Sequence, residues 1–384
     1  MKTIFTLLAA LAISAAAEPI QPGDRIAIVG NTFADQLRVH GYLESMLLHH
    51  ARENPVSIRN LGWGGDMLTS RDRPTGFPTE ESTLTAHKTD VIIACFGMGE
   101  SFAGINGVAD FEKDLNDFID SHKGKKYNGK SEVRLVLVST IAYENLGSLT
   151  PLHEKRNREL GAYSSAIRNV AENAGIPFVN VYDETKYLMS EWKDGDFTTN
   201  GIHLNETGYW AVSRMMFEQL VDEPQFAWRV RLDAKGGLTF EVADEFAPSL
   251  PPPTDAPLPP QLQDQRDMVT VENLKPGSYA LTIDDQQVAT ATHEEWVKGV
   301  VIDASPAHQD AEKYRAIVKD KNQQFIYSWK ALNQVHIVGE RRKSPAGQAL
   351  PAEVIEFNKL AEQRDRQLQD GLPLKTRVWK LTPQ

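Results

Sequence analysis

Four short segments of the chain contain residue types that nucleophilic catalysis requires. They are residues 30–35 (GNTFAD), 60–66 (NLGWGGD), 96–101 (FGMGES) and 199–203 (TNGIH). The hydroxyl of Thr32 is a poor nucleophile at neutral pH unless a base lies beside it, and the imidazole of His203 titrates in the right range for a base. Backbone N–H groups of the glycine-rich turns could stabilise a developing oxyanion. If the fold brings these segments together, they could support attack on a carbonyl group.

The elements that must position these segments alternate along residues 25–220. Short β-branched apolar runs predict strands at residues 25–30, 56–61, 91–96, 134–140 and 178–181, and amphipathic stretches predict helices at residues 33–52, 108–122, 152–174 and 207–220. This alternation indicates a parallel sheet covered by helices on both faces, a three-layer α/β fold. In such a sheet, ligands bind outside the carboxyl ends of the strands. The first three segments each follow a predicted strand, so we expect them at that edge.

The order and context of the four segments resemble the SGNH/GDSL hydrolase family. The resemblance implies a flavodoxin-like SGNH hydrolase domain at residues 22–222, with an ester-cleaving site at the carboxyl edge of the sheet. In that family the first segment supplies a serine nucleophile, the second a glycine N–H, the third an asparagine side chain and the last an Asp-x-x-His pair. By position, these roles fall on Thr32, Gly65, Gly99, Asn200 and His203. The resemblance also implies a covalent acyl intermediate formed with neither a metal nor an organic cofactor.

Several of these positions depart from the family pattern. Thr32 stands in place of serine, Gly99 in place of asparagine, and Asn200 in place of aspartate; Asn31 likewise replaces the aspartate beside the nucleophile. The methyl group of threonine restricts χ1 and crowds the line of attack. Asparagine carries no charge to stabilise an imidazolium, and in a comparable triad the change from aspartate to asparagine lowers turnover about ten-thousand-fold. The loss of one oxyanion donor costs about a hundred- to a thousand-fold.

Three hypotheses therefore stay open. The first is a working esterase in which Thr32 attacks, His203 is the base, and a carboxylate from elsewhere replaces Asn200. The second is a pseudo-hydrolase that keeps the cleft as a binding site for a carbohydrate or acyl ligand, and the third is a structural scaffold. We favour the esterase, because a hydroxyl and its base are retained. The candidate replacement carboxylates are Asp196, Asp35 and Glu100, and the candidate oxyanion or binding residues are Gly65, Gly99, Glu100 and Asn31.

Simpler structural roles compete with catalysis at several positions. Thr32 and Asp35 also fit a helix capping box, and the glycines of residues 62–65 also fit a turn that needs positive φ. The adjacent histidines at residues 49–50 cannot face one metal ion from a helix, so we interpret them as charges at a helix end. The single cysteine, Cys95, lies in an apolar strand and is expected to be buried.

The first residues carry the pattern of a secretory signal. Lys2 is followed by an apolar run over residues 4–13 and by small residues over 14–17, so we expect cleavage after Ala17 and export to the periplasm or out of the cell. No later segment has the roughly twenty apolar residues that span a bilayer. Acidic residues outnumber basic ones 52 to 41, giving a net charge of −11, which argues against a nucleic-acid partner. The expected partner is a small-molecule or carbohydrate ester, with acetyl as the expected acyl group.

The character of the chain changes after residue 222. Apolar runs on either side of a glycine-containing turn predict a β-hairpin at residues 223–246, and a proline-rich stretch predicts an extended linker at residues 247–262. Residues 263–384 are expected to form a small β element and a helical tail. The α/β domain is thus expected to carry a β-rich and helical extension that could cover its cleft.

Overall fold

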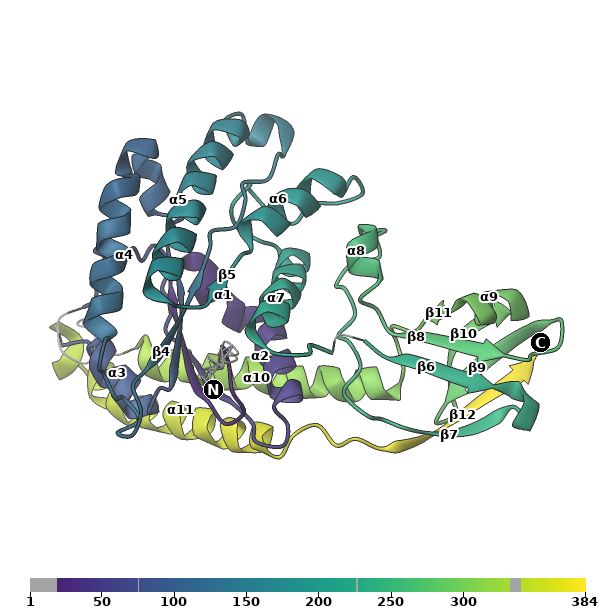
Figure 1. Cartoon of the computed structure of the whole chain (residues 1–384). Helices are drawn as coiled ribbons and strands as arrows, with labels where there is room; N and C mark the ends of the chain where they lie inside the picture. Colours follow the sequence, from purple (N-terminus) through teal and green to yellow (C-terminus); the bar gives the residue numbers. More distant parts are fainter. Residues whose placement is uncertain (1–18, 75, 226, 332–339) are drawn as a thin grey trace, which may run out of the picture.

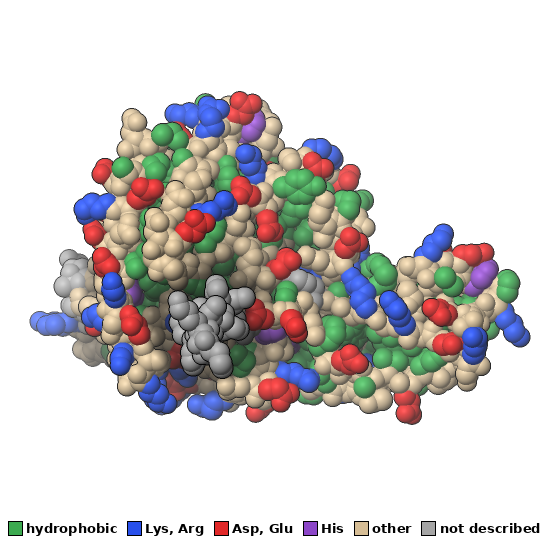
Figure 2. Space-filling view, viewed as in Figure 1, with side chains coloured by type: hydrophobic (Ala, Val, Ile, Leu, Met, Phe, Trp, Pro, Cys, Tyr) green, Lys and Arg blue, Asp and Glu red, His purple; other side chains and the backbone are tan. Residues whose placement is uncertain are grey.

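The chain folds into an α/β domain, a β-rich unit that projects to one side, and a long helical hairpin that starts beside the β-rich unit and runs along the α/β domain (Figure 1). The computed structural model describes residues 19–74, 76–225, 227–331 and 340–384, so the predicted secretory signal lies outside the described residues. Among the residues described, no helix is long and apolar enough to cross a membrane. Acidic and basic side chains are interspersed over the face shown in Figure 2.

The α/β domain is built on a parallel sheet with strand order β2-β1-β3-β4-β5. Its strands are β1 (Arg25–Gly30), β2 (Ser57–Asn60), β3 (Val91–Cys95), β4 (Arg134–Val138) and β5 (Phe178–Val179). All five lie where the apolar runs predict them. Strand β3 is buried along its whole length, as expected for a strand covered on both faces.

Helices cover both faces of this sheet, and the alternation of side chains along β1 divides the core between them. Ile26 and Ile28 face one core, while Ala27 and Val29 face the other. The first core is shared by α1 (Thr32–His40), α2 (Tyr42–His50) and α7 (Glu206–Leu220); the second is shared by α3 (Glu80–His87), α4 (Val108–His122) and α5 (His153–Ala174), and α6 (Tyr182–Glu191) follows β5. The predicted three-layer α/β fold is confirmed.

The predicted single helix at residues 33–52 is instead two helices that meet at Gly41. This glycine has φ +69°, and a Cβ built on it would lie 3.1 Å from the Cγ1 of Val318, on the distant helix α10 (Pro306–Trp329). The prediction was wrong because the break depends on a left-handed backbone conformation and on a contact with a helix far along the chain.

The β-rich unit is a sandwich of two small sheets with strand orders β10-β9-β12-β7 and β11-β8-β6. The strands are β6 (Arg229–Asp233), β7 (Thr239–Ala243), β8 (Met268–Glu272), β9 (Ser278–Ile283), β10 (Gln286–Thr292), β11 (Val300–Val301) and β12 (Thr376–Pro383). Short helix α9 (His293–Lys298) follows β10. Trp228, Trp296 and Trp379 fill the core between the sheets.

The predicted hairpin at residues 223–246 does not form. Strand β6 pairs with β8 and strand β7 pairs with β12, so the two neighbouring strands lie in different sheets. Leu232 and Phe240 reach the same core from these two sheets. The prediction was wrong because the turn carries the chain across a sandwich, where each strand buries its apolar side chains against the other sheet.

The proline-rich segment packs against the α/β domain over its extended length. The indole N–H of Trp210 donates to the Leu250 carbonyl at 2.8 Å, and that of Trp192 donates to the Pro257 carbonyl at 2.7 Å. The segment ends at the short helix α8 (Pro260–Gln263). The segment therefore connects the α/β domain to the β-rich unit and is packed against the α/β domain.

The helical part of the extension is a hairpin of α10 and α11 (Pro345–Gln369) that covers the free edge of β2. The Lys321 ammonium donates to the Ile58 carbonyl at 2.8 Å, and the Ser57 hydroxyl donates to the Asp365 carboxylate at 2.8 Å. A covered edge cannot pair with another chain. The hairpin thus completes the α/β domain.

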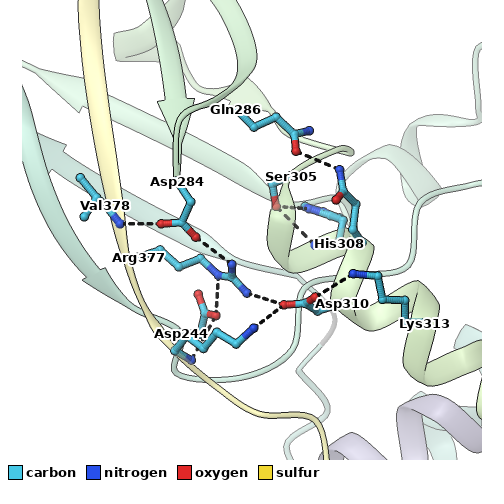
Figure 3. A network of polar contacts seen from close by, with 11 residues as sticks. Asp244, Asp284, Gln286, Ser305, His308, Asp310, Lys313, Arg377 and Val378 are labelled. Carbon is cyan, nitrogen blue, oxygen red and sulfur yellow. Dashed lines mark hydrogen bonds and ion pairs between the residues drawn. The ribbon is translucent and has the colours of Figure 1, made fainter.

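The extension ends in strand β12 and not in a helical tail. Its alternating pattern buries Trp379 between exposed neighbours, and its buried Arg377 bonds the carboxylates of Asp244, Asp284 and Asp310 at 2.9, 3.0 and 3.2 Å (Figure 3). Asp310 lies on α10, so this cluster ties the strand to the helical hairpin. The prediction was wrong here because the partners of β12 are strands far earlier in the chain.

Candidate active site

The first predicted segment turns from β1 into α1, and Asn31 is the residue that caps the helix. Its side-chain oxygen accepts a hydrogen bond from the Phe33 N–H at 3.0 Å. Thr32 is therefore the first helical residue, and the capping box predicted for Thr32 and Asp35 is wrong. Asparagine is as good a cap as threonine, and it stands one residue earlier. This leaves the cap and the candidate nucleophile on different residues.

The second segment lies close to the Thr32 side chain. A Cβ built on Gly64 would lie 3.5 Å from Thr32 Oγ1, and the Trp63 N–H donates to the Gly30 carbonyl at 2.9 Å. Within the part of the chain that the structure describes, the N–H groups of Gly64 and Gly65 donate to no protein acceptor. Both glycines are exposed, and the φ of +87° at Gly65 fits the predicted turn. These N–H groups could therefore stabilise an oxyanion beside Thr32.

The third segment provides no side-chain oxyanion donor at its family position. A Cβ built on Gly99 would lie only 2.8 Å from the Cγ of Met67, so the Met67 side chain fills the space where an asparagine would begin. Met67 was missed by sequence reasoning, because nothing local relates it to Gly99. Glu100 ties the two loops together, since its carboxylate accepts from the Leu68 N–H at 2.9 Å and from the Gly97 N–H at 2.8 Å.

The fourth segment holds the imidazole of His203 against Asn200. The Asn200 side-chain oxygen accepts from the N–H groups of Ile202 and His203 at 3.2 and 2.9 Å. These two donors fix the orientation of the amide, so its NH₂ group faces Nδ1 of His203, 3.0 Å away. Nδ1 must then accept this bond, and the neutral ring carries its proton on Nε2. A base that takes a proton from a hydroxyl at Nε2 needs the opposite tautomer.

Helix α1, which begins within the first segment, packs against α7, which follows the fourth segment. The Tyr209 hydroxyl of α7 donates to the Phe33 carbonyl at 3.4 Å, and the two rings stack with their centroids 6.2 Å apart. Asn205 caps α7, and its side-chain oxygen accepts from the Gly208 N–H at 2.9 Å. The residues next to Thr32 and the helix that follows His203 therefore lie at one edge of the sheet.

The three candidate replacement carboxylates are held in ion pairs, held in backbone hydrogen bonds, or exposed to solvent. Asp35 is paired with Arg38 at 3.0 Å and with Lys330 at 2.7 Å. Glu100 holds the backbone of the second and third segments, and burial raises its pKa. Asp196 has an exposed side chain, although its carbonyl accepts from Asn205. Among the described residues, the group that contacts His203 Nδ1 is the amide of Asn200.

A buried carboxylate that sequence reasoning missed lies behind the His203 loop. Glu144 follows β4 and accepts hydrogen bonds from Phe197 and Thr198. The rule that functional residues follow strand ends could have found it, because residues 139–146 follow the fourth strand as the other segments follow the first three.

No metal site is evident at this edge or elsewhere in the described ranges, where no group of three histidine, cysteine or acidic side chains could hold an ion. Burial lowers the pKa of His49 to about 4. Its ring is therefore neutral at pH 7, and the predicted role of this residue as a charge at a helix end is wrong. Cys95 is buried as expected, and burial raises its pKa.

Comparison with known proteins supports the fold and the family. Residues 23–211 match the model of the GDSL-like lipase/acylhydrolase family, whereas the curated proteins yield no match. Among solved structures, BT4096, described as a gut microbial diltiazem-metabolizing enzyme, is similar with a TM-score of 0.67 and 16% identity over 96% of this chain and 99% of that chain. This similarity extends through the β-rich and helical extension and shows a shared fold.

Two other solved structures are similar over about half of the chain. LAE5, an alpha/beta hydrolase enzyme from the metagenome of Lake Arreo in Spain, has a TM-score of 0.41 and 14% identity over 53% of this chain and 97% of its own. AlAXEase, an acetyl xylan esterase, has a TM-score of 0.40 and 16% identity over 51% of this chain and 100% of its own. Through residues 23–211, the chain belongs to the GDSL-like lipase/acylhydrolase family, a family of hydrolases that act on ester bonds.

Proposed function

We propose that this protein is an exported hydrolase that removes acetyl or other acyl groups from carbohydrates, with Thr32 as the nucleophile and His203 as the base. The observation that carries this proposal is the closeness of the Thr32 hydroxyl to the glycine turn, where a Cβ built on Gly64 would lie 3.5 Å from Thr32 Oγ1. Among the described residues, the N–H groups of Gly64 and Gly65 in this turn donate to no protein acceptor. A hydroxyl next to free, exposed N–H groups can attack a carbonyl while those groups hold the oxyanion.

The reaction would proceed in two steps. The His203 ring must first hold its proton on Nδ1, which leaves Nε2 free to accept. Thr32 Oγ1 then attacks the ester carbonyl and passes its proton to His203 Nε2, the C–O bond to the alcohol breaks, and the alcohol leaves with that proton. Water then attacks the acyl-threonine, gives a proton to the same nitrogen, and releases the acid as Thr32 recovers its hydrogen. The N–H groups of Gly64 and Gly65 would stabilise the oxyanion in both steps.

A groove beside the His203 loop supports a carbohydrate substrate. It has a volume of about 960 Å³ and is lined by residues that include Tyr143, Asn157, Arg158 and Asp196. Such amide, guanidinium, carboxylate and phenol groups can hydrogen-bond the hydroxyl groups of a sugar. Asp196 belongs to the same loop as His203, so the groove borders the loop that carries the proposed base.

The Asn200 amide favours a second candidate function, ligand binding without turnover. To accept a proton at Nε2, the His203 ring must carry its other proton on Nδ1, which would then face the NH₂ group of Asn200. Two donors facing each other disfavour that state. This arrangement predicts slow hydrolysis, or binding alone.

Hydrolysis of a small activated acetyl ester tests the proposal. The purified protein is compared with Thr32→Ala and His203→Ala, and with Ser305→Ala, which removes a buried hydroxyl outside the site. We expect both site variants to fall to the rate of buffer, while Ser305→Ala keeps the wild-type rate as long as it is folded.

Equal rates for the wild type, Thr32→Ala and His203→Ala would exclude catalysis by this pair. Calorimetric titration with acetylated xylo-oligosaccharides would then decide between a binding domain and a scaffold. Deacetylation of these oligosaccharides by the wild type, measured by release of acetate, would support the carbohydrate substrate.

A further inference from the structure

The loop that carries His203 is held from behind by the carboxylate of Glu144. This carboxylate is only 3% exposed, and three donors converge on it. The Phe197 N–H donates to Oε1 at 2.9 Å, and the N–H and hydroxyl of Thr198 donate to Oε2 at 2.7 and 2.5 Å. Hydrogen bonds to a charged acceptor are about twice as strong as those between neutral groups.

The hydrogen bonds of Thr198 and Glu144 also extend to Gly201, in the turn that precedes His203. The Thr198 hydroxyl accepts from the Gly201 N–H at 2.9 Å, and the Gly201 carbonyl accepts from the Glu144 N–H at 2.9 Å. Two bonds of Glu144 and one of Thr198 thus close a ring between the segment after β4 and the turn before His203. Gly201 itself lies two residues from the imidazole.

The remaining bonds of this turn are internal. The Thr199 N–H donates to the His203 carbonyl at 2.8 Å, and Asn200 accepts from two backbone N–H groups of the turn. Internal bonds set the shape of a turn, but they do not place it relative to the rest of the domain. Glu144 supplies hydrogen bonds that do, because it belongs to the segment that follows a core strand.

We propose that Glu144 is a positioning residue that sets the location of the His203 imidazole relative to Thr32. Its consequence for hydrolysis rests on the proposed function, whereas its effect on the loop does not. Burial raises the pKa of Glu144, and the hydrogen bonds from Phe197 and Thr198 oppose that shift. A buried carboxylate with three donors is a rigid support, and a catalytic group needs such support to keep its geometry.

Glu144→Gln is the informative variant. A carboxamide has one acceptor oxygen, so at least one of the three donors must face an NH₂ group. We expect amide hydrogen exchange at Phe197 and Thr198 to accelerate about ten- to a hundredfold, as the loss of a hydrogen bond to a charged group implies. We also expect the ¹⁵N shifts of the His203 ring to move toward a mixture of tautomers, and kcat to fall about tenfold or more while KM is retained.

Glu159→Gln is the matched control. Glu159 is another buried carboxylate of the same domain, on α5, and it pairs with Arg156 at 2.5 Å without contacting the loop. Loss of the Glu159 charge should lower thermal stability. It should leave the amide hydrogen exchange of Phe197 and Thr198 and the ¹⁵N shifts of the His203 ring unchanged. Glu144→Asp keeps the carboxylate on a side chain that is one methylene shorter. This variant is measured in parallel and replaces the glutamine variant if that variant does not fold.

Unchanged exchange and unchanged ring shifts in the Glu144 variants would overturn this inference, as would equal changes in Glu159→Gln. A wild type without esterase activity would overturn the proposed function alone, because exchange and ring shifts are measured without turnover. If kcat falls equally in Glu144→Gln and Glu159→Gln, the positioning role is also lost.

Discussion

Two sets of three residues in this molecule each combine a hydroxyl, an imidazole and a side chain with a carbonyl oxygen. One set lies at the edge of the α/β sheet, and the other is buried in the β-rich unit. At the edge of the α/β sheet, Thr32 lies beside a glycine turn and His203 contacts Asn200. In the β-rich unit, Ser305 Oγ lies 2.7 Å from His308 Nδ1, and His308 Nε2 lies 2.8 Å from the Asp267 carboxylate. By residue type alone, the second set is the closer match to a hydrolase triad.

Access to solvent separates the two sets. Ser305, His308 and Asp267 are 0%, 3% and 0% exposed, and Figure 3 shows Ser305 and His308 at the start of α10. Ser305 caps that helix, and Asp267 also accepts from the backbone N–H groups of Trp228 and Ser249. In the sheet-edge set, Asn200 and His203 are exposed and Thr32 is partly exposed. Within the described ranges, the N–H groups of the neighbouring Gly64 and Gly65 have no protein acceptor. The comparison teaches that residue type suggests a site, but unpaired groups within reach of solvent define one.

The largest effect is expected from Asn200→Asp, which makes the exposed set resemble the buried one in chemistry. One carboxylate oxygen would keep the backbone bonds, and the other would accept from Nδ1–H of His203, leaving Nε2 free to take the proton of Thr32. We expect the initial rate on an activated acetyl ester to rise by about a thousand- to ten-thousand-fold, the reverse of the loss known for a comparable triad.

Asn205→Asp provides the matched control for this gain. It makes the same amide-to-carboxylate change in the same loop, at the cap of α7, without contacting the imidazole. A similar rate increase in both variants would show that added charge, and not the tautomer, is responsible. No increase in either variant would favour the binding function.

A smaller effect, on stability and not on rate, is expected when the buried set is changed. Asp267→Asn leaves donors from Trp228, Ser249 and His308 around a neutral amide, and should lower the free energy of unfolding by about 3 kcal/mol, the scale found when buried pairs lose one charge. Urea denaturation measures this change, with the exposed Asp285→Asn as control. A loss of esterase rate in folded Asp267→Asn, at unchanged stability, would contradict the structural role.

The smallest effect is expected at Glu184 on α6, a half-buried acid whose neighbours are also acidic. Burial, followed by Glu218 and Asp183, raises the pKa of Glu184 to about 7. Between its ordinary pKa of 4.5 and pH 7, the unfolded chain ionises this group while the folded chain keeps it protonated, so stability is lost as pH rises through that window. Glu184→Gln should therefore stabilise the protein by about 1 kcal/mol at pH 8, after allowance for solvent screening, and little at pH 4.

Melting temperatures at both pH values check this last prediction. Glu191→Gln, an exposed acid at the end of the same helix, serves as the control. An equal shift of the melting temperature at pH 4 and pH 8 in Glu184→Gln would show that the charge of Glu184 does not matter.

The α/β domain could be predicted from the sequence because its signals are local. Each core strand is a short apolar run, and β1 and β3 begin and end close to where these runs do. The parallel order follows from the intervening helices. The β-rich unit could not be predicted in this way, because β12 pairs with β7 and β9 and so depends on contacts between distant segments.

The sequence by itself determined which residues could do chemistry and at which edge of the sheet they would lie, because strand periodicity and strand ends are properties of neighbouring residues. Only the tertiary structure decided that the Asn200 amide presents its NH₂ group to His203, that Met67 fills the space at Gly99, and that Glu144 holds the loop. The physical reason is that packing and hydrogen-bond direction depend on which atoms meet across the fold, and residues distant in sequence supply those atoms.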